Sequence, residues 1–125
     1  MNGLKVATAV FGSARAAIGA GLAVDPERLG RRWIGKDARR PRTQVALRGL
    51  GARDVAIGGG TVAAALTEDD VLLWLCGGIV SDVADIAATL SERENVPRRG
   101  VRLTAVLAGV GVIAGAALAG AWARG

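Results

Sequence analysis

The sequence contains no histidine and no tyrosine, and Cys76 is its only cysteine. A single cysteine cannot form a disulfide within these 125 residues and cannot supply a multi-cysteine metal site. The absence of histidine removes a common haem ligand and the most frequent general base. We therefore expect no metal site, no cofactor and no catalytic residue, and we predict that the protein is not an enzyme.

Aromatic residues are also scarce, whereas small and aliphatic residues are abundant. Aromatic side chains make up 3% of the chain, and 19 of its 125 residues are glycine. The hydrophobic fraction of 51%, to which glycine adds, exceeds the share of about 45–50% that soluble domains reach with glycine included. Small residues let helices approach closely within lipid. The composition thus indicates a single integral membrane domain over residues 1–125.

Four apolar segments predict an all-α protein, a four-helix transmembrane bundle. The clearest segment is 101–123, because its part 103–123 carries no charge and is long enough to cross a hydrocarbon core of about 30 Å. The segment 71–90 is the next most apolar, whereas charged residues interrupt 4–24 and 45–66. Four spans are the most economical interpretation, since a helix that carries charges can be shielded by apolar neighbours.

The charges of the connecting loops predict the orientation of the bundle. The first loop, 25–44, contains seven Lys and Arg residues and the third, 91–100, contains three, whereas the second, 67–70, contains none. Because Lys and Arg favour the cytoplasmic side, both termini are expected outside. Trp74 and Trp122 then lie near the outer interface, where indole rings concentrate. We predict a multi-pass protein of the plasma membrane, the bacterial inner membrane.

The first loop has the signature of a short interfacial helix. Asp25 followed by Pro26 is a typical helix start, and Leu29 and Trp33 share one face among Arg and Lys side chains. Such a helix suits anionic lipid, although these charges would also serve as a topology signal alone. We expect Pro41 to end this helix before the second span. Because the basic residues lie between membrane segments, we expect no nucleic acid as a partner.

Five ionisable residues lie inside the predicted spans, where an ionised side chain costs at least about 2.5–3.5 kcal/mol on insertion scales. Asp82 and Asp85 share one helix face at spacing i, i+3. At 1.5 Å per residue, Asp82 lies about 16 Å from one surface, and Arg53 and Asp54 lie about 12–14 Å from the other. Arg15 lies halfway along the first span. The depths predict one buried polar layer of five residues: Arg15, Arg53, Asp54, Asp82 and Asp85.

The charges of this layer do not cancel. Three carboxylates and two guanidinium groups leave one negative charge, which is costly in a low-dielectric site. Either a carboxyl group holds a proton, which the two aspartates of the third span can share, or a cation or small molecule binds. The structural alternative is a network that only fixes helix order and rotation. Two functions stay open: a membrane protein that binds a proton, ion or small molecule, and a structural or accessory subunit.

Two glycine patterns predict close packing. Gly111 and Gly115 form a small-x-x-x-small motif on the fourth span. The motif favours packing within the bundle, with dimerisation as the alternative, so a second copy or another membrane subunit stays open as a partner. The glycines 58–60 partly match a dinucleotide-binding turn, but the third glycine and a βαβ unit are missing. We interpret them as a site of close packing or local bending.

The second span also contains a Gly-x-Arg-Asp element, Gly51-Ala52-Arg53-Asp54, within the run 47–58. Together with the aspartates of the third span, this element resembles small bacterial four-helix integral membrane proteins of unknown function. The resemblance covers most of the chain. It implies the four-span architecture and brings no activity with it.

Overall fold

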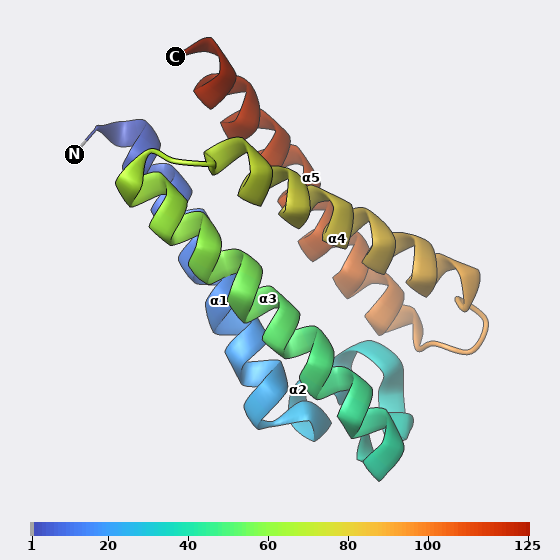
Figure 1. Ribbon diagram of the computed structural model, residues 1–125. Helices are drawn as coiled ribbons and strands as arrows, with labels where there is room; N and C mark the ends of the chain where they lie inside the picture. Colours follow the sequence, from blue (N-terminus) through green and yellow to red (C-terminus); the bar gives the residue numbers. More distant parts are fainter. Residues whose placement is uncertain (1) are drawn as a thin grey trace.

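The computed structural model describes residues 2–125, and all regular structure in this range is helical (Figure 1). The elements in chain order are α1 (Gly3–Val24), α2 (Pro26–Ile34), the 3₁₀ helix η1 (Gly35–Arg39), α3 (Pro41–Thr67), α4 (Val71–Ser91) and α5 (Arg98–Arg124). The predicted all-α class is therefore confirmed for these residues.

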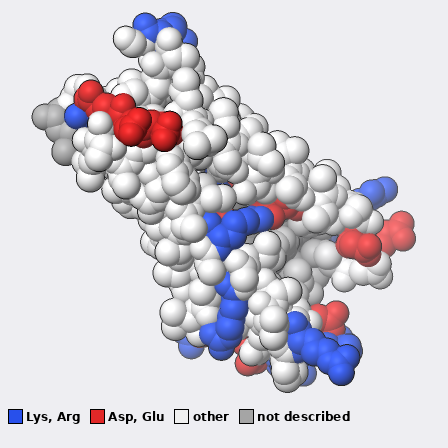
Figure 2. Space-filling model, viewed as in Figure 1, with Lys and Arg blue, Asp and Glu red and all other residues white. Residues whose placement is uncertain are grey.

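Three helices, α1, α4 and α5, are long and apolar enough to cross a membrane. With 27 residues, α3 has sufficient length but is not among these three, because Arg53 and Asp54 interrupt its apolar stretch. The fourth span, and with it the four-helix transmembrane bundle, stays a prediction. Figure 2 shows charged side chains mainly at the two ends of the molecule, with a belt of uncharged residues between them. One small blue and red cluster interrupts this belt.

The helices that follow the basic loops begin earlier than the predicted spans. The span expected from residue 45 begins at Pro41 in α3, and the span expected from residue 101 begins at Arg98 in α5. Proline precedes or opens both helices, and its fixed φ favours the first helical turn. Pro41 was expected to end the helix of the first loop, which ends earlier, at Ile34. Gly35 follows with a φ of 81°, a left-handed value that suits glycine and stops the helix.

The long helices form two antiparallel pairs, α1 with α3 and α4 with α5 (Figure 1). Both termini and the short connection between α3 and α4 lie at one end of the molecule. The opposite end carries α2, η1 and the connection between α4 and α5. The two basic loops therefore share one end, as the predicted threading requires, and the acidic connection 68–70 lies at the other.

Glycines allow α1 and α3 to approach each other closely. Gly12 and Gly19 of α1 face Gly58 and Gly51 of α3, so both helices repeat the contact after seven residues. A methyl group added at Gly19 would lie 2.5 Å from the carbonyl oxygen of Gly51, and one added at Gly51 equally close to the carbonyl oxygen of Gly19. Such backbone contact is the packing mode that small residues permit within lipid.

The end of the molecule that carries the termini is closed by tryptophan. Trp74 packs its ring over Gly60, where a side chain larger than hydrogen would clash. Trp122 donates a hydrogen bond from Nε1 to Thr8 Oγ1, over 2.9 Å. Both indoles also pack against the buried side chain of Leu75 and its neighbours. The two residues predicted for the outer interface thus lie at a common end and take part in the packing between helices.

Candidate functional site

The five charged residues predicted to share a layer lie together in the structure. They form a continuous series of ion pairs, which we call the charge chain: Asp82, Arg15, Asp54, Arg53 and Asp85, in the order of their contacts. Arg15 comes from α1, the neighbouring residues Arg53 and Asp54 come from α3, and both remaining aspartates come from α4. Positive and negative side chains therefore alternate along the charge chain, and a carboxylate lies at each of its ends.

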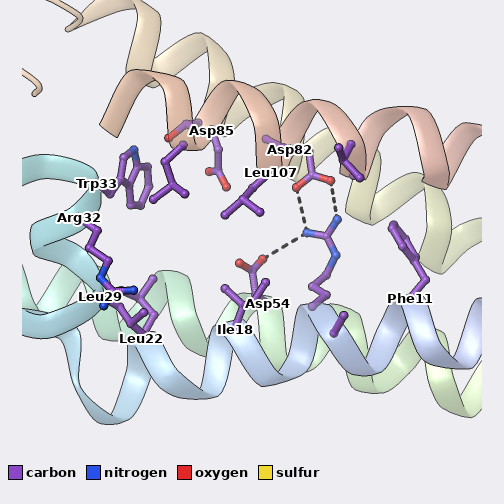
Figure 3. A pocket seen from close by; sticks show the side chains of 17 residues that line it. Phe11, Ile18, Leu22, Leu29, Arg32, Trp33, Asp54, Asp82, Asp85 and Leu107 are labelled. Carbon is purple, nitrogen blue, oxygen red and sulfur yellow. Dashed lines mark hydrogen bonds and ion pairs between the residues drawn. The ribbon is translucent and has the colours of Figure 1, made fainter. Parts of the chain in front are cut away.

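The Arg15–Asp82 pair is the most buried part of the charge chain. Arg15 donates from Nη1 to Asp82 Oδ1 over 3.1 Å and from Nη2 to Oδ2 over 2.5 Å (Figure 3). The two side chains are 11% and 9% exposed. Gly111 of α5 faces the Asp82 carboxylate and leaves room for it, and Gly78 of α4 lies against the guanidinium group. This two-pronged geometry fixes the rotation of α1 relative to α4.

Arg53 forms the second two-pronged pair. It donates from Nη1 to Asp85 Oδ1 over 3.1 Å and from Nη2 to Asp85 Oδ2 over 2.8 Å. The same guanidinium group donates from Nε and Nη2 to Asp54 Oδ1, over 3.3 and 3.1 Å. These side chains are more accessible, at 28% for Arg53 and 21% for Asp85. The pair connects α3 to α4, so both arginines of the α1–α3 pair hold an aspartate of α4.

Asp54 joins the two halves of the charge chain. Its Oδ1 accepts from Arg53 and also lies 3.6 Å from Arg15 Nη1. Depth along the helices predicts that these residues share one layer, but it does not predict that Asp54 stands between the two arginines. That position follows from the rotation of α3 about its axis, which its glycine contacts with α1 determine.

A groove of about 470 Å³ lies beside the charge chain, between α1 and α5 (Figure 3). Arg15, Asp54, Asp82 and Asp85 form its polar floor. The walls are apolar and come from three helices: Phe11, Ile18 and Leu22 of α1, Leu29 and Trp33 of α2, and Leu103, Leu107 and Val110 of α5. Ile18 and Val110 are each more than half exposed, so the groove opens sideways between the two helices. Its size falls in the range of small-molecule sites, about 300–1,000 Å³.

The helix α2 closes one end of this groove. Trp33 donates from Nε1 to Thr89 Oγ1 of α4, over 3.0 Å, and its carbonyl group packs against Gly100 of α5. Leu29 lies against Gly21 of α1. The face formed by Leu29 and Trp33, which the sequence suggested would lie on lipid, therefore packs against the other helices. The exposed Arg32 lines the same end of the groove, and within residues 2–125 it makes no ion pair.

The groove itself was not foreseen from the sequence. Phe11 carried one usable signal, because it precedes Arg15 by four residues and therefore shares its helix face. The Arg15 guanidinium carbon lies 5.9 Å from the centroid of the Phe11 ring, within cation–π range. Arg32 and Trp33 gave no such signal, since their position depends on how α2 docks. Cys76 is exposed on α4 and does not line the groove.

The remaining candidate residues lie in the packing between α4 and α5. Gly111 and Gly115 are both buried, and Gly115 faces Ile79 of α4. In the part of the chain that the structure describes, no group of three or more His, Cys, Asp or Glu residues is arranged to hold a metal ion.

Comparison with family models, with curated proteins and with solved structures found no match. A functional interpretation therefore depends on the charge chain and the groove. Together they provide an apolar binding volume whose floor contains strongly polar groups. Such an arrangement can bind an amphipathic molecule, and it can also hold the two helix pairs together.

Proposed function

We propose that this protein is a four-span protein of the bacterial inner membrane that binds a small amphipathic molecule in the groove beside the charge chain. The observation that carries the proposal is the groove of about 470 Å³, with its apolar walls and three carboxylates on its floor. A site of this kind is typical of small-molecule pockets, which combine apolar walls with a few polar groups. An intramembrane ionisable group also indicates function by default.

The packing of α3 supports its assignment as the fourth span. Gly51 and Gly58 contact α1 over two helical turns, so α3 must share the environment of α1. If α1 crosses the membrane, α3 crosses with it. Its charged residues Arg53 and Asp54 turn toward the other helices and are paired there, which lowers the cost of burying them.

The distribution of charge supports an orientation with both termini outside. The basic loops gather at one end of the molecule and the acidic connection lies at the other (Figure 2). By the positive-inside rule, the basic end faces the cytoplasm. The exposed arginines of α2 then lie at the level of the lipid headgroups, where anionic lipid is the expected partner. A second copy of the chain or another membrane subunit stays open as a further partner.

The structural alternative has an observation in its favour. Arg15 and Arg53 both reach from the α1–α3 pair to α4, and each makes two hydrogen bonds to one aspartate. Among residues 2–125, no buried side-chain nitrogen or oxygen lacks a hydrogen-bond partner. The charge chain would therefore also serve a subunit in which it only holds the helix pairs together.

The two proposals differ in what happens when the groove is filled. We expect at least one of three eight-carbon probes, octyltrimethylammonium, octanoate or octanol, to raise the unfolding temperature of the protein in maltoside micelles. Leu107→Trp, which fills the groove, should abolish this shift. Val106→Trp adds the same side chain one position away, outside the groove lining, and should preserve it.

Ligand binding stabilises a protein by about 2.7 kcal/mol at a ligand concentration 100-fold above Kd. A shift of this kind is readily measured by differential scanning fluorimetry through the intrinsic tryptophans. If no probe shifts the unfolding of the parent protein, the binding function is wrong. An equal shift in Leu107→Trp would place binding outside the groove.

A further inference from the structure

The balance of positive and negative groups that line the groove differs from the balance in the charge chain as a whole. Three carboxylates line the groove, but of the two arginines in the charge chain only Arg15 does so. Arg53 contacts Asp54 and Asp85 without lining the groove. Arg32 also lines the groove, but it is exposed at the α2 end, where solvent and ions screen its charge. The floor therefore presents an excess of negative charge to the groove.

The carboxylate oxygens on this floor can accept more hydrogen bonds than they receive. Both hydrogen bonds that Asp54 accepts from Arg53 reach Oδ1, and Arg15 Nη1 lies 3.6 Å from the same oxygen. Within residues 2–125, no hydrogen bond reaches Oδ2. An ionised carboxylate offers about four acceptor positions. Because no fully buried side-chain oxygen in this range lacks a partner, Oδ2 is not fully buried, and Asp54 lines the groove. Figure 3 shows Asp54 and Asp85 directed toward that space.

The walls of the groove indicate which kind of ligand body would fit beside these charges. Apart from the charge chain, Arg32 and Thr104, every lining residue is apolar. The aromatic rings of Phe11 and Trp33 lie toward its two ends (Figure 3). Apolar and aromatic walls accept a hydrocarbon or aryl body, and aromatic faces attract cations. An inorganic ion would leave these walls uncovered, and an uncharged acyl chain would leave the negative charge without a partner.

We propose that the groove binds a lipophilic organic cation, with its ammonium or phosphonium group at Asp54 and Asp85 and its apolar body against α1 and α5. The inference rests on the proposed function and adds the sign of the charge on the ligand. The five residues of the charge chain carry one net negative charge, and the positive group of the ligand balances it. A carboxylate within a low-dielectric surrounding attracts such a cation more strongly than it would in water.

The test uses two probes of nearly equal size and opposite charge, tetraphenylphosphonium and tetraphenylborate. Binding to the full chain in maltoside micelles is measured by equilibrium dialysis, with empty micelles as the blank. We expect saturable binding of the phosphonium and none of the borate. Asp54→Asn should weaken phosphonium binding at least tenfold. Asp69→Asn changes the net charge equally, lies in the exposed connection after α3, and should leave binding unchanged.

Several outcomes would overturn the inference. Borate binding that equals or exceeds phosphonium binding would show that Arg32 or the apolar walls dominate, and the groove would remain a binding site of another charge class. Equal weakening in Asp69→Asn would reduce the effect to net charge. No saturable binding of either probe, while octanoate or octanol but not octyltrimethylammonium stabilises the protein, would contradict the inference and leave the proposed function intact.

Two further arms deal with lipid and with folding. Phosphatidylethanolamine carries an ammonium group, but its headgroup belongs at the interface, so we expect it not to displace the phosphonium. Displacement would assign the site to a lipid headgroup and overturn the inference. If Asp54→Asn does not fold, Leu107→Trp replaces it and should abolish phosphonium binding, with Val106→Trp as the matched control. Retained binding in a folded Leu107→Trp would contradict the groove as the site.

Discussion

Among the acidic residues of the charge chain, we expect Asp82 to contribute the most to stability. Its side chain is the most buried of the charge chain, and its carboxylate occupies the space that Gly111 leaves open. Removing one partner of a buried ion pair leaves an uncompensated charge, which costs about 3–5 kcal/mol. Asp85 differs, because it is more exposed and because its partner Arg53 also holds Asp54.

We therefore expect Asp82→Asn to lower the free energy of unfolding by about 3–5 kcal/mol, and Asp85→Asn to lower it by less. Denaturant titration in maltoside micelles, followed by tryptophan fluorescence, measures both values. Combining Arg15→Gln with Asp82→Asn removes both charges and should recover part of the loss. If Asp82→Asn and Asp85→Asn lowered the free energy of unfolding equally, burial would not control how much each ion pair contributes to stability.

At the scale of the helix, the contact between α1 and α3 depends on the absence of side chains at particular positions. Gly49 and Gly51 lie two residues apart on α3, yet their surroundings are opposite. A methyl group added at Gly49 would have nothing within 4 Å. At Gly51 it would lie 2.5 Å from the carbonyl oxygen of Gly19 and 2.6 Å from the backbone nitrogen of Ala23. The backbone of α1 cannot move away locally, so the helices must separate.

Gly51→Ala should accordingly destabilise the protein by about 1–3 kcal/mol, the usual cost of overpacking. Gly49→Ala should be neutral or should stabilise α3 by up to about 1 kcal/mol, because alanine favours helix more than glycine does. Thermal unfolding of the two variants beside the parent protein makes the comparison. A loss of similar size in both would mean that the helices do not approach as closely as the structure describes.

At the scale of the whole molecule, the two ends differ in charge, and this difference predicts how the chain is threaded. Replacing exposed Arg39 of η1 and Asp69 by cysteine, each in a Cys76→Ser background, places one thiol at each end. An impermeant maleimide applied to spheroplasts should label Asp69→Cys at once. It should label Arg39→Cys only after the membrane is permeabilised. The opposite pattern would invert the orientation, and labelling of both before permeabilisation would contradict four spans.

Local features of the sequence determined much of the fold. Apolar segments of sufficient length form helices regardless of their partners, and three of the four predicted segments correspond to helices that can cross a membrane. The helix start at Asp25 and Pro26 depends only on neighbouring residues, and α2 begins there. The rise per residue was enough to bring Arg15, Arg53 and Asp82 to one level, since depth along a helix is a local quantity.

The sequence by itself thus determined the helices, the common depth of the five charges and the excess of negative charge among them. Only the tertiary structure decided that Arg15 pairs with Asp82, 67 residues away, and that Asp54 stands between the arginines. It also decided that α2 turns Trp33 inward and that a groove opens beside the charge chain. These features depend on helix rotation and on close packing at glycines. Such packing is a property of two surfaces that meet, and neither surface specifies it alone.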